Sequence, residues 1–524
     1  MSQNDNLDAA WQYHSGTKHS YLSVRMQPHI LDWENQPLLF KIYPTLEVTR
    51  LPRDFNDTGK AALAAIAARN RSTTGEAVAD FETLAQMLFF TAGVTRSKKH
   101  PGGETFFRAA ASTGALYEIE LYLMCADIRG RYQKPEDSPA LPAGIYHFAA
   151  AEFGLRQLRA GDFRQALVDA TGNEPSVEHS PANIISTGTY WRNAWKYHAR
   201  TYRHFGWDNG TMLANLLAIS AAMNLPAKVI TGFVDAQVNQ LLSLDIQREV
   251  AFSLVSLGHT EAKPLVAPPV AALELPTIPY SASEVDYPAM REMHAASSLE
   301  SSDEVTTWRT QAPSGPTSPA KGTLTTLSPV DESKIPPDTI EQVISRRGST
   351  RQFARDPLTL PQLSTILDRA TGGIPADFLS PFGSHLNDLY LVVNSVVGLS
   401  PGAYFYRWEE RQLELLKAGD FRDQAGYLGL EQQIPADAAV DVFFLADLKK
   451  ILERYGNRGY RAVQLEAGIL GGKLYLAAYA QKLGASGLTF YDDDVVSFFS
   501  PHARGKSAIF LVALGRSALR KRAG

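Results

Sequence analysis

Apolar positions along this chain follow two patterns, one with the length of strands and one with the spacing of helices. Glu118 to Ala126 and Leu389 to Val397 are apolar runs of strand length. Gly210 to Met223 and Gly468 to Leu483 are longer, and their many Ala and Leu residues recur at helical spacing, which predicts core helices. Strands and helices in this mixture indicate an α+β fold, in which helices pack on a sheet.

The residues after both predicted helices follow the same order. Short strands are predicted at Lys228 to Thr231 and Gly487 to Phe490, and final strands at Phe252 to Leu257 and Ala508 to Leu514. Between them stand acidic residues, Asp235 in one place and Asp492-Asp493-Asp494 in the other. Three aspartates in a row resemble a metal cluster, but capping and the helix dipole alone favour acidic residues at a helix start. We therefore interpret them as helix caps and expect no metal.

The common order reflects a repeat in the sequence itself. Gly144-Ile145-Tyr146 returns as Gly402-Ala403-Tyr404, Ala160 to Arg164 as Ala418 to Arg422, and Tyr197, Arg200, Tyr202 and Arg203 as Tyr455, Arg458, Tyr460 and Arg461, always 258 residues later. Solenoid repeats are only roughly 20 to 50 residues long, so this period predicts a duplicated globular domain. We expect copy 1 over residues 11–260 and copy 2 over residues 338–518, folded as an internal pseudo-dimer.

The segment between the copies, residues 261–337, has a different composition. It is crowded with Pro, Ser, Ala and Thr, as in Ala312 to Pro319, and its hydrophobic periodicity is weak. Such a segment buries too little apolar surface to offset the entropy of ordering it, which predicts a linker. The stretch from Tyr280 to Ala296 has enough apolar residues for a short docked helix.

Bulk composition excludes some classes of protein. The 524 residues are 44% hydrophobic, enough for packed cores, and the net charge of −4 argues against a general nucleic-acid-binding surface. The single cysteine, Cys125, lies in an apolar run and is expected to be buried. His198 and His204 have no Cys or acidic partners that complete a zinc pattern. The chain begins without an apolar signal region and has no run of about 18 apolar residues, so we expect a cytoplasmic protein without a membrane partner.

Candidate chemistry begins with Ser345-Arg346-Arg347-Gly348-Ser349-Thr350-Arg351-Gln352-Phe353, at the start of copy 2. Arginine forks with a hydroxyl between them suit a phosphate ester, although such a basic run alone is more often a solvated helix end. This run resembles the N-terminal signature of the nitroreductase superfamily. The resemblance implies an FMN site at the interface of two subunits.

Copy 1 carries a second resemblance. Residues 108 to 122, RAAASTGALYEIELY, are similar to the pattern R-x-x-P-S-x-G-A-L-Y-P-x-E-x-Y of SagB-type dehydrogenases, with Ala111 in place of the first proline. The opening Tyr13 to His19 and the stretch Lys196 to Arg203 are also SagB-like. In that branch the Ser and Gly of the pattern, here Ser112 and Gly114, approach the flavin from the partner subunit.

Each copy lacks the motif that the other has kept. The counterpart of the arginine motif in copy 1 is taken to be Thr49 to Phe55, which contains a proline and no serine. The counterpart of the serine loop in copy 2 is Ser380 to His385, with Pro381 where Ser112 stands. The resemblance therefore implies one good FMN site per chain, built by Arg347, Ser349 and Arg351 of copy 2 with Ser112 and Gly114 of copy 1.

The same resemblance implies further contacts. Backbone around Leu488, Thr489 and Phe490 is expected near the isoalloxazine, and Arg516 near the phosphate. The alternative for Arg516 is a solvated tail with Arg520, Lys521 and Arg522.

Lys196 and Tyr197 are the candidate catalytic residues. In azoline-oxidising SagB-type members a Lys-Tyr dipeptide is implicated in proton removal, and a lysine with a lowered pKa is a suitable base. The alternative is an exposed helix lysine beside a tyrosine of the core. Copy 2 has Arg454 in place of the lysine, and arginine is a poor base.

Three functions remain open from the sequence. The first is an FMN-dependent dehydrogenase or oxidase of the SagB type, which desaturates azoline rings or related bonds in a modified peptide alongside biosynthetic partner enzymes. The second is a general nitroreductase-like NAD(P)H:acceptor flavin reductase for small molecules. The third is a flavin-poor scaffold that binds a peptide or a partner enzyme.

Overall fold

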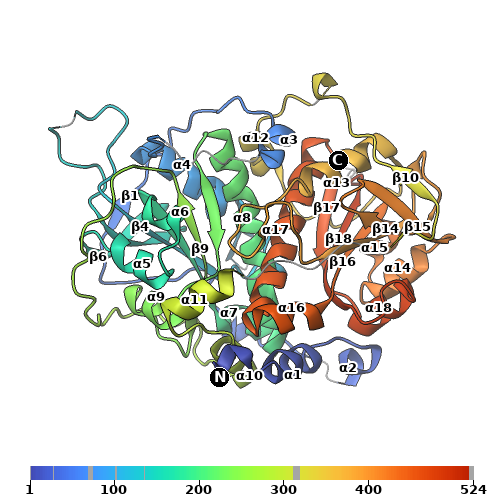
Figure 1. Cartoon of the computed structure of the whole chain (residues 1–524), viewed down its shortest axis with the longest axis horizontal. Helices are drawn as coiled ribbons and strands as arrows, with labels where there is room; N and C mark the ends of the chain where they lie inside the picture. The colour runs from blue at the N-terminus through green and yellow to red at the C-terminus, as the bar shows by residue number, and fades with distance from the viewer. Residues whose placement is uncertain are drawn as a thin grey trace.

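Two seven-stranded sheets lie on either side of a pair of long helices (Figure 1). The computed structural model describes residues 2–26, 29–68, 75–100, 103–134, 136–310, 319–334 and 336–518. Most of the proline-rich run Ala312 to Pro319 and the tail residues Arg520, Lys521 and Arg522 lie outside this part of the chain.

Both sheets are antiparallel throughout and have the same strand order. The first runs β1 (Val48–Arg50), β6 (Gly154–Ala160), β5 (Gly144–Ala149), β4 (Ile119–Cys125), β7 (Ala182–Thr189), β9 (Glu249–Leu257) and β8 (Ala227–Ile230). The second runs β10 (Leu324–Thr326), β15 (Gln412–Ala418), β14 (Gly402–Arg407), β12 (Asp388–Val393), β16 (Val440–Ala446), β18 (Ser507–Gly515) and β17 (Gly484–Leu488). This agreement confirms the α+β fold and the tandem arrangement of two copies.

Helices cover both sheets. In copy 1 they are α3 (Ala62–Ala67), α4 (Phe81–Ala92), α5 (Arg164–Ala170), α6 (Pro175–Glu178), α7 (Tyr190–Tyr197), α8 (Thr201–Ala222) and α9 (Asp235–Leu241). In copy 2 they are α12 (Ile340–Arg346), α13 (Leu360–Ala370), α14 (Arg422–Leu428), α15 (Gln433–Asp437), α16 (Leu448–Tyr455), α17 (Arg458–Ala480) and α18 (Asp492–Phe499). The N-terminal arm holds α1 (Asp8–Gly16) and α2 (Tyr21–Met26), and the segment between the copies holds α10 (Pro288–Ala296) and α11 (Ser302–Arg309). Two small two-stranded sheets pair β2 (Val94–His100) with β3 (Gly103–Arg108), and β11 (Leu358–Thr359) with β13 (Val396–Val397).

The long central helices begin earlier than the apolar pattern predicts. Helix α8 starts at Thr201 rather than Gly210, and α17 starts at Arg458 rather than Gly468. The first turns of α8 bury polar residues such as Arg203 and Asp208, which interrupt the apolar pattern although they are fully packed. The apolar pattern therefore does not show where these helices start, because their first turns contain buried polar side chains.

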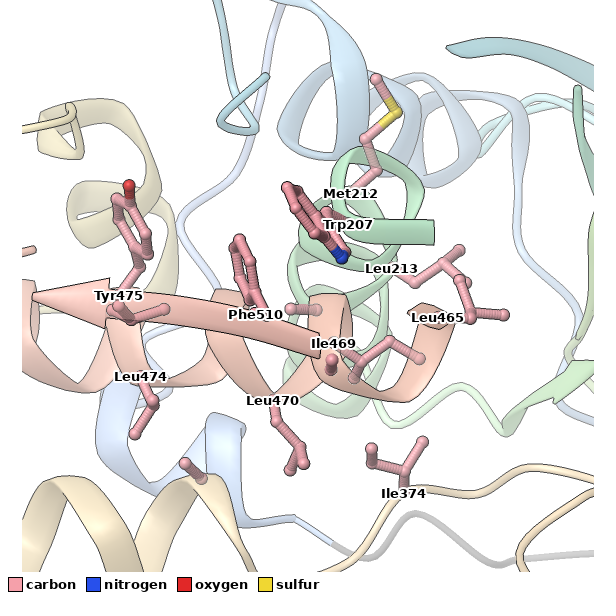
Figure 2. Packing of buried hydrophobic residues seen from close by; sticks show 14 of the residues in the cluster. Trp207, Met212, Leu213, Ile374, Leu465, Ile469, Leu470, Leu474, Tyr475 and Phe510 are labelled. Carbon is pink, nitrogen blue, oxygen red and sulfur yellow. The ribbon is translucent and has the colours of Figure 1, made fainter. Parts of the chain in front are cut away.

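Helices α8 and α17 cross where both have glycine. A Cβ added at Gly210 would lie 2.4 Å from the backbone of Gly468, its equivalent 258 residues later. Around this crossing Trp207 and Leu213 of α8 pack among Leu465, Ile469 and Leu470 of α17 (Figure 2). The two copies thus share one apolar core across the crossing.

The aspartates predicted as helix caps have another role. The side chains of Asp235 and Asp492 make no capping bond in α9 and α18. Each is buried and binds two arginines at the start of the other copy's long helix. Asp492 pairs with Arg200 at 3.1 Å and Arg203 at 2.7 Å, and Asp235 pairs with Arg458 and, at 2.7 Å, with Arg461. Both aspartates lie in the first turn of their helices as predicted, but neither forms a capping bond, because their oxygens bind the arginines and the N–H groups of Leu299 and His19.

Helices α1 and α10 complete these clamps in a reciprocal way. The Nδ1 atom of His14 lies 3.3 Å from the Tyr460 hydroxyl, and that of His294 lies 3.3 Å from the Tyr202 hydroxyl. The predicted docked helix is thus present as α10, and it repeats α1. Strand β10 also falls within residues 261–337 and joins the second sheet. The duplicated unit is longer than its sequence motifs indicate.

The counterpart assigned to the arginine motif is also corrected. Ala61 and Thr339 form an antiparallel bridge, so α3 and α12 are the equivalent helices. The motif follows α12, whereas Thr49 to Phe55 begins in β1. The residues that follow α3 in the sequence, 69–74, lie outside the described part of the chain.

Two smaller expectations concern burial. Cys125 is buried, as predicted, and burial raises the pKa of its thiol to about 12. No helix within the described residues is long and apolar enough to cross a membrane.

Candidate active site

The arginine motif of copy 2 contacts the entrance of the serine loop of copy 1. Half-buried Arg347, at the end of α12, donates from Nε to the carbonyl of Ala109 at 3.0 Å and from Nη2 to that of Arg108 at 3.1 Å. Ser112 follows three residues later. The structure therefore brings together the two half-motifs that the sequence places 235 residues apart.

The rest of the motif runs beside β17. The Ser349 hydroxyl lies 3.3 Å from the Tyr475 hydroxyl, and the N–H of Thr350 donates to the Ala485 carbonyl at 2.8 Å. Arg351 is exposed, and its charge acts on Lys196 and Tyr197. Arg516 instead turns away and donates to the carbonyl of Pro357 at 3.4 Å.

The serine loop has an unusual backbone. Gly114, Ala115 and Tyr117 all have positive φ, of 68°, 55° and 53°. A Cβ at Gly114 would lie 2.9 Å from the Tyr197 hydroxyl, although Gly114 is itself exposed. Non-glycine residues in this conformation cost about 1–3 kcal/mol each and gather at functional sites.

Two buried carboxyl groups hold this loop from beneath. Asp208 of α8 accepts from the N–H of Thr113 at 2.6 Å and from its hydroxyl at 2.7 Å. Glu118 lies 3.5 Å from the Ser112 hydroxyl, and burial and the neighbouring Asp208 raise its pKa well above the usual range. Ser112 also accepts from the N–H of Tyr117 at 2.9 Å.

Lys196 and Tyr197 lie at the end of α7, where His198 (φ 51°) breaks the helix. Both side chains are half-buried, and the Lys196 Nζ lies 5.4 Å from the Tyr197 ring centre. Burial and the charge of Arg351 lower the pKa of Lys196. Burial, Asp208 and Glu118 raise the pKa of Tyr197, which keeps its phenol protonated. Lys196 makes no ion pair with any described residue.

The residues after β17 close the other side of the site. Leu488 and Phe490 are buried, and the guanidinium of Arg200 lies 5.4 Å from the Phe490 ring. The Thr489 hydroxyl is buried without a hydrogen-bond partner among the described residues. A buried polar atom of this kind needs a partner.

This donor set fits FMN. Arg347, Ser349 and Arg351 offer charged and neutral donors for a phosphate, while exposed Gly114 faces the Tyr197 hydroxyl and the buried Thr489 hydroxyl is without a partner among the described residues.

Several further residues of this site were missed from the sequence. His204 packs 4.8 Å from the Tyr197 ring and 4.9 Å from that of Trp207, and His19 acts electrostatically on His204. Burial and Arg200 lower the pKa of His19 to about 3. The 258-residue period could have found these positions, because copy 2 has Ala462 and Leu465 at the places of His204 and Trp207.

A cavity of about 1150 Å³ lies elsewhere, on copy 2. Residues of the shortened loop, including Pro381 and His385, line it together with Asp388 and Phe405 of the sheet. None of the predicted site residues lines this cavity, and we do not assign it to the flavin.

Comparisons with known proteins agree with the fold. Residues 344–516 match the model of the nitroreductase family, so copy 2 carries a nitroreductase-family domain. "Putative nitroreductase MJ1384" of Methanocaldococcus jannaschii is 28% identical over 178 residues, which cover 32% of this chain and 85% of that protein. Nitroreductase family members are flavin-dependent oxidoreductases that typically bind FMN.

Two solved structures extend the comparison. The crystal structure of "a putative nitroreductase" from Anabaena variabilis covers 97% of this chain and 99% of its own, with 24% identity and a TM-score of 0.74, so it has the same two-copy fold. A chain of the E. coli microcin synthetase McbBCD complex covers 49% of this chain and 93% of its own, with 16% identity and a TM-score of 0.29. That score is too low to bear on chemistry.

Proposed function

We propose that this chain, whose second copy is a nitroreductase-family domain, is an FMN-dependent oxidoreductase of the SagB type that desaturates azoline rings or related bonds in a modified peptide. The contact between Arg347 and the entrance of the serine loop carries this proposal, because it joins half-motifs from the two copies. Biosynthetic partner enzymes would supply the ring-containing peptide.

Arg347 and Ser349 would hold the FMN phosphate, with Arg351 at the rim. The guanidinium now donates to two backbone carbonyls, which are weaker acceptors than a phosphate dianion, so exchanging them for phosphate oxygens is favourable. The serine loop at Ser112 and Gly114 and the backbone at Leu488 to Phe490 would border the ring system. Arg516 has no part in this arrangement.

Lys196 would act as the base. When bound, FMN supplies a two-electron acceptor, and desaturation also requires removal of a proton from the adjacent atom. A neutral amine performs this removal, and the lowered pKa of Lys196 increases the neutral fraction at physiological pH. Tyr197 stays protonated and would donate a hydrogen bond that orients the substrate.

One site per chain is proposed, beside the serine loop of copy 1. At the equivalent place copy 2 has Arg454 for Lys196, Pro381 for Ser112 and Leu299 for His19. Leu299 is equivalent to His19 because its N–H donates to Asp235 at 3.0 Å, as that of His19 donates to Asp492 at 2.8 Å. These replacements remove the base and the serine together.

Turnover with two substrate classes tests the function. A peptide that contains a thiazoline or oxazoline should be oxidised, with flavin reduction visible under anaerobic conditions. Reduction by NAD(P)H with transfer to a quinone or nitroarene, and no reaction with the peptide, would support the general flavin reductase instead. A colourless protein that binds peptide but turns over neither substrate would support the scaffold.

A further inference from the structure

Two buried carboxyl groups, those of Glu118 and Asp208, lie under the serine loop. Glu118 stands where the SagB-type pattern has its second proline, and its side chain is fully buried. Asp208, on α8, is 3% exposed. Both groups touch the serine loop, Glu118 through Ser112 and Asp208 through Thr113, and two buried carboxyl groups that act on each other cannot both be ionised.

The surrounding contacts indicate which group is ionised. Asp208 accepts two short bonds from Thr113, of 2.6 and 2.7 Å, and these stabilise a carboxylate. Glu118 has one oxygen, Oε1, that is buried without a partner among the described residues, and its Oε2 lies 3.5 Å from the Ser112 hydroxyl. The proton therefore belongs on Glu118, and Asp208 carries the charge.

Copy 2 provides an internal comparison. Glu466 occupies the place of Asp208 and accepts from the N–H groups of Leu386 and Asn387 at 2.9 and 2.8 Å. Its side-chain partner is the amide of Asn387, which donates at 2.7 Å. An amide supplies a hydrogen bond without a titratable proton, so the second carboxyl is found only in the copy that has the serine loop.

We propose that Glu118 and Asp208 form a clamp that shares a single proton and holds Ser112 and Thr113 in the conformation that accepts the flavin. This inference rests on the proposed function for the identity of the ligand. Glu118 and Asp208 are positioning residues, since their contacts reach the ligand through Ser112 and Thr113.

The clamp gives the site a defined response to pH. Burial and Asp208 raise the pKa of Glu118, so the shared proton persists at neutral pH. The charged and titratable groups around the pair are Arg108, Arg192 and Tyr197. Loss of the proton at alkaline pH would place two adjacent negative charges under the loop, and their repulsion would loosen it.

Infrared spectroscopy of the flavin-free protein tests the shared proton without reference to turnover. At pH 8.5 we expect a protonated-carboxyl band that is lost in Glu118→Gln and retained in Glu466→Gln. Burial raises the pKa of Glu466 to about 7, so this group is mostly ionised at pH 8.5. A difference spectrum of wild type minus Glu118→Gln that contains no protonated-carboxyl band would overturn the shared proton whether or not FMN binds. The buried Asp441, whose pKa burial also raises, cancels in this difference.

Ligand binding tests the clamp. Riboflavin, which has no phosphate to titrate, should bind wild-type protein at least tenfold less tightly at alkaline pH than at neutral pH, while Glu118→Gln should bind with an affinity that stays level. Asp208→Asn should weaken binding about 10- to 100-fold, because Thr113 loses a charged acceptor. Equal pH dependence in wild type and Glu118→Gln would overturn the clamp. Absence of FMN and riboflavin binding at every pH would refute the proposed function, and the infrared result would still decide the pair.

Discussion

At the scale of single residues, the site depends on small differences between equivalent positions. Lys196 and Arg454 lie at the ends of the equivalent helices α7 and α16, whose last residues are Tyr197 and Tyr455. Lys196 has a lowered pKa, and beside it the charges of Asp208 and Glu118 keep the phenol of Tyr197 protonated. A base therefore exists on one side of the molecule alone.

Lys196→Arg should lower kcat/KM for the peptide about 10²- to 10⁴-fold, the usual contribution of a general base, and leave FMN binding unchanged. In wild type the neutral amine is the active form, so kcat/KM should rise with pH through the lowered lysine pKa and then level off. Arg454→Lys is the matched control and should change neither quantity. An unchanged rate in Lys196→Arg would exclude this residue as the base.

Gly114 is a second critical residue. Gly114→Ala would place a Cβ 2.9 Å from the Tyr197 hydroxyl at φ 68°, so both the clash and the backbone conformation oppose it. We expect FMN affinity to fall at least tenfold by equilibrium titration, with little loss of global stability because the loop is at the surface. Gly505→Ala, also at positive φ but with open space around it, should leave FMN affinity unchanged.

At the scale of elements, the sequence predicts what periodicity can encode. Strand β4 and the cores of α8 and α17 follow from apolar runs, and the 258-residue period reveals the duplication. The first turns of α8 were not predicted, because Arg203 is buried by its contact with Asp492 of copy 2 and Asp208 by its contacts with the serine loop. The ion pairs of Asp235 and Asp492 were not predicted either, because a local sequence pattern does not indicate a partner more than 200 residues away.

The residues of the candidate site also include some that the sequence predicts and some that it does not. Arg347, Ser112 and Lys196 were predicted through motifs, and contacts of Arg347 with Ala109 and of Gly114 with Tyr197 connect their segments. Glu118 and Asp208 were not found, because their importance comes from mutual contact. A carboxylate two residues before the predicted core helix at Gly210, however, is a signal that Asp208 offered.

The crossing of α8 and α17 gives a test at this scale. Alanine is the better helix former than glycine by about 1 kcal/mol, but the Cβ in Gly210→Ala would lie 2.4 Å from backbone of α17 that cannot move aside. The clash should prevail and lower the free energy of unfolding by about 1–3 kcal/mol or more in urea denaturation. Gly16→Ala, with open space around it, is the control. A Gly210→Ala protein as stable as wild type would contradict the close crossing.

At the scale of the whole molecule, the two copies form an internal pseudo-dimer. The arm that precedes each copy packs against the long helix of the other copy. Helix α1 of the N-terminal arm contacts the start of α17, and α10 contacts the start of α8 (Figure 1). Each arm completes a buried clamp of one aspartate and two arginines. Separation of the copies would leave these charges unpaired, so the fused chain should unfold as one unit.

Asp235→Asn should lower the free energy of unfolding by about 3–5 kcal/mol, because Arg458 and Arg461 lose a buried partner. Burial raises the pKa of Asp235, but the two arginines outweigh it and lower this pKa to about 2. The clamp therefore contributes fully above pH 4, and its contribution is lost as pH falls from about 4 to about 2. The stability difference between wild type and Asp235→Asn should shrink over that range. A difference that is independent of pH would contradict the ion pair.

The central claim is a single composite FMN site, built by the arginine motif of copy 2 and the serine loop of copy 1. Its most direct test is the number of FMN molecules released per chain from purified protein, measured for wild type, Arg347→Ala and Arg346→Ala. Arg346 is the matched control, since it is exposed and binds Asp338. We predict close to one FMN in wild type and in Arg346→Ala, and almost none in Arg347→Ala. Two FMN per chain, or one that persists in Arg347→Ala, would contradict the claim.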